Sequence, residues 1–373
     1  MGFFNITKQY LAILPTAFGL DISDTSVKFL QLTPEDGYFD LLVWGQKDIP
    51  KGIVEKGVIK KPADLSSILK KHLVEDKPKG LSSYAVFSLP DEEIFLKQIR
   101  LPQMPEEEME SSVYIEAEGS IPIGINDAYL DYNVLDSNKN EKDPQTDILI
   151  AAARRSTVDV YVDVLMEAGI TPVALEPEVV AISRSAIAGE KVANPILIVE
   201  VGANRTRLIA FVKNAVIFTG AVNFSAQELN ASMAKNLSMK ESEIVALKDK
   251  SEKFKDKKFA DIYEASLKKE LKPLVDAIED YSSFYKTQVD GGNVSARPFE
   301  KVLVSGGGSR APGVEKQLSL ILQVPVEQAN PWVNVLPPEI KETPELNLEE
   351  SVRFTTAIGL AIRGASNGLK EIS

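Results

Sequence analysis

Two short segments of the chain share an arrangement of residues that suits the binding of phosphate. GLDISDTSVKFLQL and ILIVEVGANRTRLIAF each read as an apolar strand, a turn of small or polar residues and a second strand. Asp21 ends the first strand of one segment, and Glu200 has the same place in the other. A carboxylate at the end of a buried strand costs free energy unless it meets a cation or a metal-bound water. The backbone N–H groups of the adjoining turn suit a phosphate group.

The two segments lie about 180 residues apart, which is the scale of a duplicated domain and not of a solenoid repeat. We expect the two hairpins to face one another and to hold a polyphosphate between two domains. Each acid would contribute, through water, to the shell of a Mg²⁺ ion. Either hairpin alone is weak evidence, because a strand, an acid and a turn follow one another by chance in many α/β chains.

A third segment, VLVSGGGSRAPG, carries Gly306, Gly307 and Gly308 between an apolar strand and a predicted helix. Glycines at such a place let the backbone pack against a flat or charged ligand, and the N-terminus of the helix favours a phosphate. A purely structural turn explains one glycine well, but it explains three glycines followed by Ser309 and Arg310 less well. The segment is not a P-loop, because no Gly-Lys-Ser or Gly-Lys-Thr follows.

Composition narrows the function classes. With 373 residues, 44% of them hydrophobic and 26% charged, the chain is typical of a soluble globular protein of at least two domains. A net charge of −12 argues against nucleic acid as a partner. The absence of cysteine excludes disulfides, thiol nucleophiles and thiolate metal sites. His72 is the single histidine and lies in a lysine-rich helix, so histidine metal clusters are excluded and we do not expect a histidine-based triad.

No apolar run approaches the roughly 18 residues of a membrane-spanning helix, and no signal-peptide pattern opens the chain. The first residues, MGFFNITKQYLAIL, are apolar enough for a short amphipathic segment at a membrane surface. We favour a terminus that packs on the domain or is disordered. The sequence therefore predicts a cytosolic protein.

Strands and helices alternate along the chain, which predicts an α/β architecture. The expected strands are the two hairpins at 19–32 and 196–211 and the segments 40–49, 84–90, 128–135, 146–153, 302–305 and 324–329. The expected helices cover 65–73, 105–121, 156–169, 176–189, 225–237, 238–248, 267–285 with a kink at Pro273, 313–322 and 351–364. Ser-x-x-acid capping boxes are expected at Ser156, Ser225 and Ser238, and 248–261 reads as a charged loop. The acid-rich helix 105–121 turns Met109, Val113 and Ala117 inward.

The order of these parts resembles the five-part pattern of the actin/Hsp70/sugar-kinase ATPase superfamily, which ends in a helix like TAIGLAIRG. Within its FtsA/PilM branch, the chain resembles the PilM family of actin-like type IV pilus assembly proteins. The residues that carry this resemblance are LPQMPEEEMESSVYIEAEGSIPIGINDAYLDYNVL, DVLMEAGITPVALEPEVVAISRS and VPVEQANPW. The resemblance runs over residues 18–364.

The resemblance implies an actin-like ATPase fold with two duplicated ribonuclease-H-like core domains and an inserted small α+β domain. The boundaries that it implies are an N-terminal segment 1–17, core domain 1A at 18–92 and 171–195, inserted domain 1C at 93–170, core domain 2A at 196–224 and 300–373, and subdomain 2B at 225–299.

The resemblance also implies roles for single residues around ATP or ADP with Mg²⁺. The first phosphate hairpin would use Asp21, Ser23, Thr25, Ser26 and Lys28, and the second Glu200, Gly202, Asn204 and Thr206. The adenosine side would use Gly306, Gly307, Gly308, Ser309 and Lys248, although Lys248 reads equally well as a solvated surface lysine. Glu176 matches the helix acid that positions the attacking water in hydrolysing relatives; a helix-start acid favoured by the dipole is the equal alternative.

Three positions depart from the pattern of the superfamily. Ser23 stands where relatives usually have glycine, so a Cβ intrudes where the backbone would approach phosphate. Glu200 replaces the usual aspartate, and Val245 replaces a glutamate that binds the ribose. Phosphoryl transfer depends on positioning and on Mg²⁺ geometry, so we expect nucleotide binding with slow or absent hydrolysis.

The function implied by the resemblance is that of a cytoplasmic scaffold at the inner face of the cytoplasmic membrane. It would bind the N-terminal cytoplasmic tail of a PilN-like inner-membrane protein in a groove between the first core domain and the inserted domain. It would also couple the platform protein of the inner membrane to the pilus assembly ATPase. An FtsA-like cell-division protein is one alternative, although the tail ASNGLKEIS is short and weakly apolar for the membrane anchor of that family. A small-molecule kinase of the same superfamily is the other.

Overall fold

The computed structural model describes residues 16–138, 144–189, 194–212, 215–247, 251–288 and 299–366. The chain divides into two compact units. Unit 1 consists of Met1–Gly189, Pro331–Leu348 and Phe354–Ser373, and unit 2 of Glu190–Asn330 and Glu349–Arg353. The expected N-terminal segment 1–17 lies outside the described residues except for its last two.

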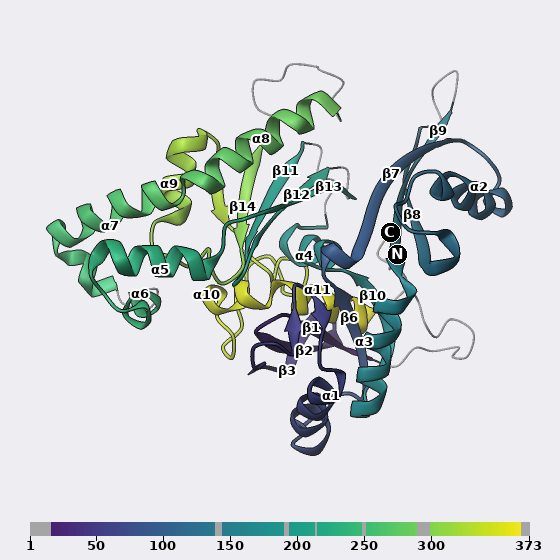
Figure 1. Cartoon of the computed structure of the whole chain (residues 1–373), viewed down its shortest axis with the longest axis horizontal. Helices are drawn as coiled ribbons and strands as arrows, with labels where there is room; N and C mark the ends of the chain where they lie inside the picture. Colours follow the sequence, from purple (N-terminus) through teal and green to yellow (C-terminus); the bar gives the residue numbers. More distant parts are fainter. Residues whose placement is uncertain are drawn as a thin grey trace. The chain divides into compact units, whose positions relative to one another are not determined.

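Unit 1 is built on a five-stranded sheet in the order β10-β6-β1-β2-β3 (Figure 1). The chain enters it through an antiparallel meander of β1 (Phe18–Ile22), β2 (Ser26–Glu35) and β3 (Tyr38–Asp48). On the other side of β1 lie β6 (Tyr84–Leu89) and β10 (Thr171–Pro177), which run parallel to it. The carboxyl ends of three strands therefore meet at one edge of the sheet.

Unit 2 repeats this sheet in the order β13-β12-β11-β14-β15. An antiparallel meander of β11 (Ile196–Val201), β12 (Thr206–Val212) and β13 (Ala215–Val222) is followed by two parallel strands, β14 (Lys301–Ser305) and β15 (Val326–Gln328). The same strand order and directions in both sheets confirm the duplicated core that the two hairpins predicted.

Helices cover both faces of the first sheet because side chains of successive strand residues alternate between the faces. On one face, α1 (Pro62–Lys70), its π-helical extension Lys71–Glu75 and α3 (Arg155–Ala168) bury a stripe of leucine, valine and tyrosine side chains against the sheet. On the other face, α11 (Thr355–Ser366) packs on β1 and β2, and α4 (Glu178–Ala186) packs on α11. Two short strands, β4 (Val54–Glu55) and β5 (Val58–Ile59), form a small hairpin of their own.

A separate three-stranded antiparallel sheet, also in unit 1, follows the order β7-β9-β8. Its strands are β7 (Ile94–Pro102), β8 (Ala128–Asn138) and β9 (Gln145–Arg154), and α2 (Glu106–Glu118) packs on it. The predicted inward face of α2 is confirmed, since Met109, Val113 and Ala117 are buried there. The domain boundaries stay a prediction; α3, which falls inside the stretch 93–170, contributes to the core of the five-stranded sheet.

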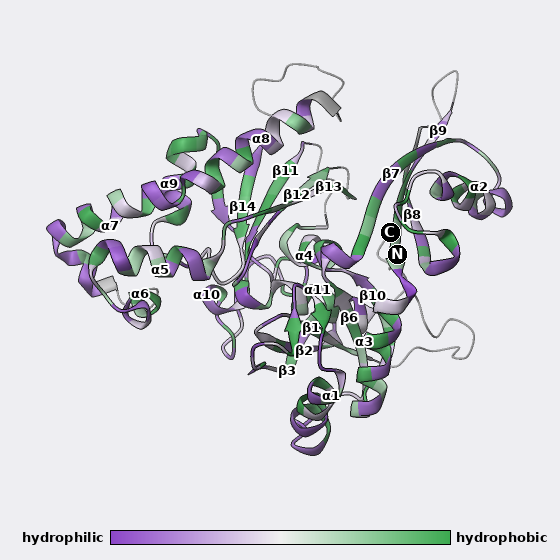
Figure 2. Cartoon of the chain, in the orientation of Figure 1, coloured by the Kyte–Doolittle hydropathy of each residue, from purple (hydrophilic) through white to green (hydrophobic). Residues whose placement is uncertain are grey.

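The helices of unit 2 enclose a core with one face of the second sheet. They are α5 (Ala226–Leu237), α6 (Glu241–Ala246), α7 (Lys257–Glu270), α8 (Lys272–Gln288) and α9 (Val314–Leu322). Hydrophobic and hydrophilic residues alternate along their ribbons, as expected for helices buried on one side (Figure 2). The short α10 (Leu348–Ser351) precedes α11.

The local signals at helix ends were only partly correct. Ser225 is the N-cap of α5, as predicted, and accepts a hydrogen bond from Glu228 N. The predicted box at Ser238 is wrong, because Ser238 ends α5 in a left-handed conformation (φ 51°) and Lys240 is the N-cap of α6. The box at Ser156 is also wrong, since α3 begins one residue earlier, after Arg154, without a side-chain cap.

The predicted long helix and the charged loop before it also need correction. Pro273 stands in the first turn of α8 and separates it from α7, because proline lacks the N–H that a continuous helix requires and fits a first turn well. The stretch 248–261 contains a 3₁₀ helix, Ser251–Lys255, and the first turn of α7.

Candidate functional site

The carboxylate of Asp21 lies at the carboxyl end of β1 and is paired with a cation of its own hairpin. Asp21 and Lys28 are directly opposite one another in the antiparallel pairing of β1 with β2. Lys28 Nζ donates to Asp21 Oδ2 at 3.2 Å, and the two side chains are 16% and 7% exposed. The predicted need of this buried acid for a cation is thus met by a lysine seven residues further along the chain.

The turn after β1 is closed by its own side chains. Ser23 N donates to Ser26 O at 2.9 Å, and Ser26 N donates to Ser23 Oγ at 3.2 Å. The carbonyl of Thr25 accepts a bond from Ile49 N, and the carboxylate of Asp24 accepts two bonds of 3.0 Å from the turn between β4 and β5. Ser23, which replaces the expected glycine, therefore stabilises the turn.

The second hairpin repeats the acid–base pair of the first. Glu200 and Arg207 are opposite one another in the pairing of β11 with β12, as Asp21 and Lys28 are in the first sheet. Arg207 Nη1 donates to Glu200 Oε2 at 2.9 Å, and both side chains are 13% exposed. The spacing between acid and base is again seven residues.

The other predicted residues of the second hairpin have different surroundings. Gly202 N donates to Arg205 O at 2.9 Å and closes the turn. Asn204 is exposed at the tip of the turn. Thr206 is fully buried, and its hydroxyl donates to Phe224 O at 2.8 Å, so this side chain anchors the hairpin to the start of α5.

The glycine-rich turn after β14 approaches the chain itself. Gly306 has a φ of 80°, and a Cβ there would lie 2.7 Å from Glu200 Oε1 and 2.5 Å from Val201 O. A Cβ at Gly308 would lie 2.3 Å from Val201 Cγ1, whereas one at Gly307 would have ordinary space. Two of the three glycines are therefore required for the turn to pack on β11, and this packing brings the turn against the carboxylate of Glu200.

Further hydrogen bonds fix this turn. Gly306 N donates to Val352 O at 3.1 Å, and Gly308 N donates to Val201 O at 2.9 Å. Ser309 is buried; its Oγ donates to Gly306 O at 2.8 Å and accepts a bond from Gln328 Nε2 at 2.8 Å. Unit 2 thus brings together Glu200, the second hairpin and the glycine-rich turn, as the sequence predicted.

Two arginines share one carboxylate beside the glycine-rich turn. Arg310 Nη1 lies 2.6 Å from Glu350 Oε1, and Arg353 Nη1 lies 3.2 Å from Glu350 Oε2. These two ion pairs hold α10 and the residues after it against the glycine-rich turn.

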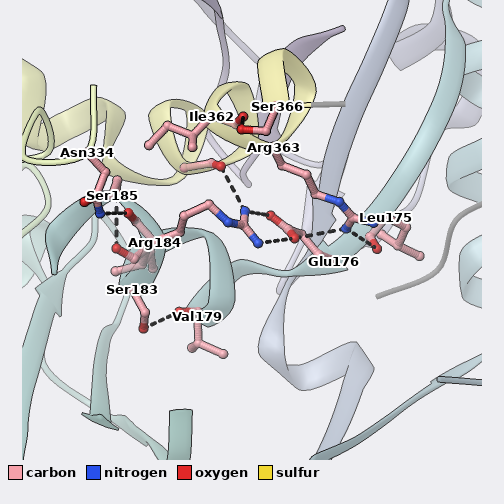
Figure 3. A network of polar contacts seen from close by, with 12 residues as sticks. Leu175, Glu176, Val179, Ser183, Arg184, Ser185, Asn334, Ile362, Arg363 and Ser366 are labelled. Carbon is pink, nitrogen blue, oxygen red and sulfur yellow. Dashed lines mark hydrogen bonds and ion pairs between the residues drawn. The ribbon is translucent and has the colours of Figure 1, made fainter. Parts of the chain in front are cut away.

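Glu176 lies at the centre of a buried polar network in unit 1 (Figure 3). Arg184 of α4 binds both oxygens of its carboxylate, with Nη2 at 2.8 Å from Oε2, and Arg363 of α11 donates to Oε2 at 3.0 Å. Arg184 also donates to Gly359 O at 2.9 Å, and Arg363 to Leu175 O at 3.4 Å. The network therefore ties α4 and α11 to the end of β10.

The protonation of Glu176 follows from these contacts. Burial disfavours the charged form and is the largest single influence on the carboxyl group. The charges and hydrogen bonds of Arg184 and Arg363 together outweigh it, so the pKa of Glu176 is lowered below its ordinary value. The group is an ionised, fully hydrogen-bonded carboxylate, which is a poor base for the activation of water.

The position of Glu176 in the secondary structure differs from the prediction. It is the last but one residue of β10, and α4 begins only at Glu178. Pro177, expected inside the helix, is its N-cap with extended backbone angles. Glu176 is thus not a helix acid, and its role in positioning water stays a prediction.

Basic residues bind each of the three acids Asp21, Glu200 and Glu176. Of these bases, only Lys28 was among the residues singled out from the sequence. Arg207 was detectable, because it has the same spacing from Glu200 that Lys28 has from Asp21. Arg363 follows its partner Glu176 by 187 residues, and no local pattern reveals such a pairing.

Lys248 lies outside the described residues, and Val245 is exposed on α6. Within the described part of the chain, His, Asp and Glu side chains nowhere gather in threes that could hold a metal ion. Since Asp21 and Glu200 are each bound to a base, the described residues of either unit by itself do not offer a donor set that fits Mg²⁺. Among the same residues, none of the helices has the length and apolar character that a bilayer crossing requires.

Comparison with known proteins gives a family and a fold. A family model described as type IV pilus assembly protein PilM matches residues 19–365. The solved PilM-PilN type IV pilus biogenesis complex contains a chain that is 25% identical and superposes with a TM-score of 0.73, over 94% of this chain and 98% of that one. The ethanolamine utilization protein EutJ from Carboxydothermus hydrogenoformans superposes with a TM-score of 0.52 at 14% identity, over 93% of this chain and 90% of that one. With the duplicated sheets, these likenesses confirm the predicted actin-like ATPase fold.

Proposed function

Because the chain belongs to the family of the type IV pilus assembly protein PilM, we propose that it is a scaffold of pilus assembly that binds the N-terminal cytoplasmic tail of a PilN-like inner-membrane protein. The observation that carries this proposal is the likeness to the PilM-PilN complex over 94% of the chain. The remaining 6% is much shorter than the three-stranded sheet with α2 at 94–154, so the likeness extends into that sheet.

We place the tail between the three-stranded sheet and the first core domain, both of which belong to unit 1. Two features of this sheet suit an extended peptide. β7 and β8 are edge strands, and an edge strand offers backbone groups to an added strand. Apolar side chains are also exposed here, with Val134 on β8 and Ile115 on α2 at 50% and 73% exposure.

We further propose that the chain binds ATP or ADP through its two hairpins and its glycine-rich turn, with slow or absent hydrolysis. The duplicated hairpins and the turn against Glu200 support the binding. Slow turnover is supported by Glu176, whose carboxylate is held by two arginines and is thereby prevented from acting as a base. Nucleotide binding would bias the conformation that receives the tail.

The remaining partners follow from the scaffold role. We propose that the chain is cytoplasmic and peripheral at the inner face of the cytoplasmic membrane, where PilN-like tails emerge. There it would contact the platform protein and the pilus assembly ATPase.

A binding experiment with a synthetic PilN-like tail from the same genome tests the scaffold. Isothermal titration of the full chain is expected to show saturable binding of the tail and none of a scrambled tail. Val134→Asp on the edge strand β8 is expected to weaken binding. Leu320→Asp, at another exposed apolar position on α9 of unit 2, is expected to leave it unchanged. Failure of the native tail to bind would refute the scaffold role.

A phosphate-release assay with ATP and Mg²⁺ separates a nucleotide-binding scaffold from an enzyme. We expect release at the level of the protein-free control. Rapid release would contradict the inactive role given to Glu176, and release that depends on an added sugar or other small hydroxyl compound would favour a kinase.

A further inference from the structure

The turn between β4 and β5 is bound to the first hairpin by one carboxylate. This turn consists of Lys56 and Gly57, whose φ angles of 50° and 76° are typical of the two-residue turns that suit a β-hairpin. Asp24, in the turn after β1, accepts hydrogen bonds of 3.0 Å from the backbone N–H groups of both residues. Its neighbours Ser23 and Thr25 are among the residues proposed to contact phosphate. A ligand on the first hairpin therefore lies next to the residue that holds the β4–β5 turn.

The same turn contacts the segment that leads into the three-stranded sheet. A Cβ at Gly57 would lie 2.4 Å from Pro90 Cγ, so the backbone of the turn packs directly on this proline. Pro90 begins the connector 90–93 between β6 and β7, and its carbonyl accepts a hydrogen bond from Glu93 N at 2.9 Å. The β4–β5 turn thus lies between the first hairpin and the connector.

The helix that follows the three-stranded sheet binds both the turn and the connector. Tyr161 of α3 is buried, and its hydroxyl donates to Gly57 O at 2.7 Å. About one helical turn earlier, Thr157 Oγ1 donates to Glu93 Oε2 at 2.8 Å. Because α3 begins directly after β9, the chain returns from the three-stranded sheet at this helix. Both passages between the two sheets of unit 1 are therefore held to the β4–β5 turn.

We infer that the β4–β5 turn couples the first hairpin to the three-stranded sheet, so that a nucleotide on the hairpin strengthens the binding of the PilN-like tail. Asp24 and Tyr161 are the positioning residues of this coupling. The inference rests on the nucleotide and tail binding proposed above, and it deepens that proposal by naming the contacts that join the two events. All residues of the coupling belong to unit 1.

The β4–β5 turn suits this role because its position depends on its neighbours. β4 and β5 have two residues each and form a sheet of their own. A hairpin of two strands is marginally stable by itself. A phosphate group bound by the turn after β1 fixes Asp24, and Asp24 in turn fixes the β4–β5 turn and the connector. The tail then binds a sheet that is already positioned, and less of the binding free energy is lost to ordering.

The test is a thermodynamic cycle with the full chain. A synthetic PilN-like tail is titrated with and without saturating ATP and Mg²⁺, and ATP is titrated with and without the tail. We expect ATP to strengthen the binding of the tail about five- to twentyfold, which lies within the usual range of coupling between two sites. The tail should strengthen the binding of ATP by the same factor, because such coupling is reciprocal.

Tyr161→Phe removes one hydroxyl from the coupling and is expected to reduce the factor to less than about twofold. Each ligand alone should bind this variant as it binds the unaltered chain. Tyr281→Phe is the matched control, because the hydroxyl of Tyr281 in unit 2 also donates to a backbone oxygen, that of Phe218, at 2.7 Å. It should keep the full coupling. Asp24→Ala, at the other end of the coupling, should reduce the factor as Tyr161→Phe does.

The thermal unfolding midpoint of every variant shows whether it is folded. A factor of one in the unaltered chain, with both ligands bound, overturns this inference and leaves the proposed binding of each ligand intact. Full coupling in a folded Tyr161→Phe, or an equal loss of coupling in Tyr281→Phe, also overturns it. Absence of tail binding refutes the scaffold role and absence of ATP binding refutes the nucleotide site, and the inference falls with either.

Discussion

Replacement of Glu176 by glutamine should strongly destabilise unit 1. Glu176 is fully buried and faces Arg184 and Arg363, whose side chains are 22% and 10% exposed. Glu176→Gln removes the negative charge that these two guanidinium groups share and leaves both of them in a poorly solvated place. Removal of one partner from a buried ion pair costs about 3–5 kcal/mol, and we expect a loss of free energy of unfolding in that range.

The two tryptophans of the chain provide the assay. Trp44 and Trp332 both belong to unit 1, so urea unfolding followed by tryptophan fluorescence reports on the unit that contains the network. Glu264→Gln, which removes an exposed acid paired with Lys316 in unit 2, is the control and should leave the transition unchanged.

The acid side of the stability profile gives an independent readout. The pKa of Glu176 is lowered in the folded chain from an ordinary value of 4.5. A carboxyl group whose pKa is lower in the folded than in the unfolded chain stabilises the folded chain fully at pH values above its unfolded pKa. This contribution is lost as the pH falls through the folded pKa. Below about pH 4.5 the native chain should therefore lose stability more steeply than Glu176→Gln.

Two results would refute this reasoning. One is a decrease of less than about 1 kcal/mol in the free energy of unfolding of Glu176→Gln, which would mean that solvent reaches the two arginines. The other is an identical acid dependence of the two chains. Joint replacement of Glu176, Arg184 and Arg363 by leucine or methionine should recover most of the loss, because an apolar cluster of similar volume avoids the desolvation of charge.

Three further substitutions test the packing. Gly308→Ala should cost about 1–3 kcal/mol in unfolding followed by far-UV circular dichroism, because its Cβ meets a valine methyl of β11 at 2.3 Å; Gly307→Ala, with 3.6 Å of space, should stay within about 0.5 kcal/mol. Ser238→Gly should raise stability by about 0.5–1 kcal/mol, since Ser238 has a left-handed C-cap conformation; a loss would restore the capping box that the sequence suggested. Gly359→Ala should lower the free energy of unfolding of unit 1, followed by tryptophan fluorescence, by at least about 3 kcal/mol, because a Cβ lies 1.9 Å from a backbone oxygen of α4.

The hairpins were predictable because the signal is local. Asp21 and Glu200 each end an apolar run before a turn of small or polar residues, and the strand pairing depends on little else. The glycine-rich turn was predictable for the same reason. What the glycines approach so closely was not predictable. The sequence suggested a ligand as the close neighbour of Gly306 and Gly308, whereas Val201 is that neighbour.

The surroundings of Glu176 were beyond a local pattern. The pair Glu176-Pro177 suits a helix start and a strand end equally well, and pairing with β6 decides for the strand. Arg363 reaches Glu176 only because α11 returns to the first sheet at the end of the described chain. The capping box predicted at Ser238 was wrong because a Ser-x-x-Glu spacing also arises when one helix ends just before another begins.

The return of α11 to the first sheet also has a consequence for the order of folding during synthesis. α11 buries Ala357, Ile358 and Ala361 against Leu30 and Leu32 of β2, so one half of that core is made more than 300 residues after the other. Most of unit 2 is a continuous stretch that ends before α11 emerges from the ribosome. An apolar face of unit 1 therefore stays exposed until α11 is synthesised, whereas most of unit 2 can fold before that. Contacts between residues so far apart in the chain also form slowly. Nascent chains that stop short of α11 should be the ones that chaperones retain.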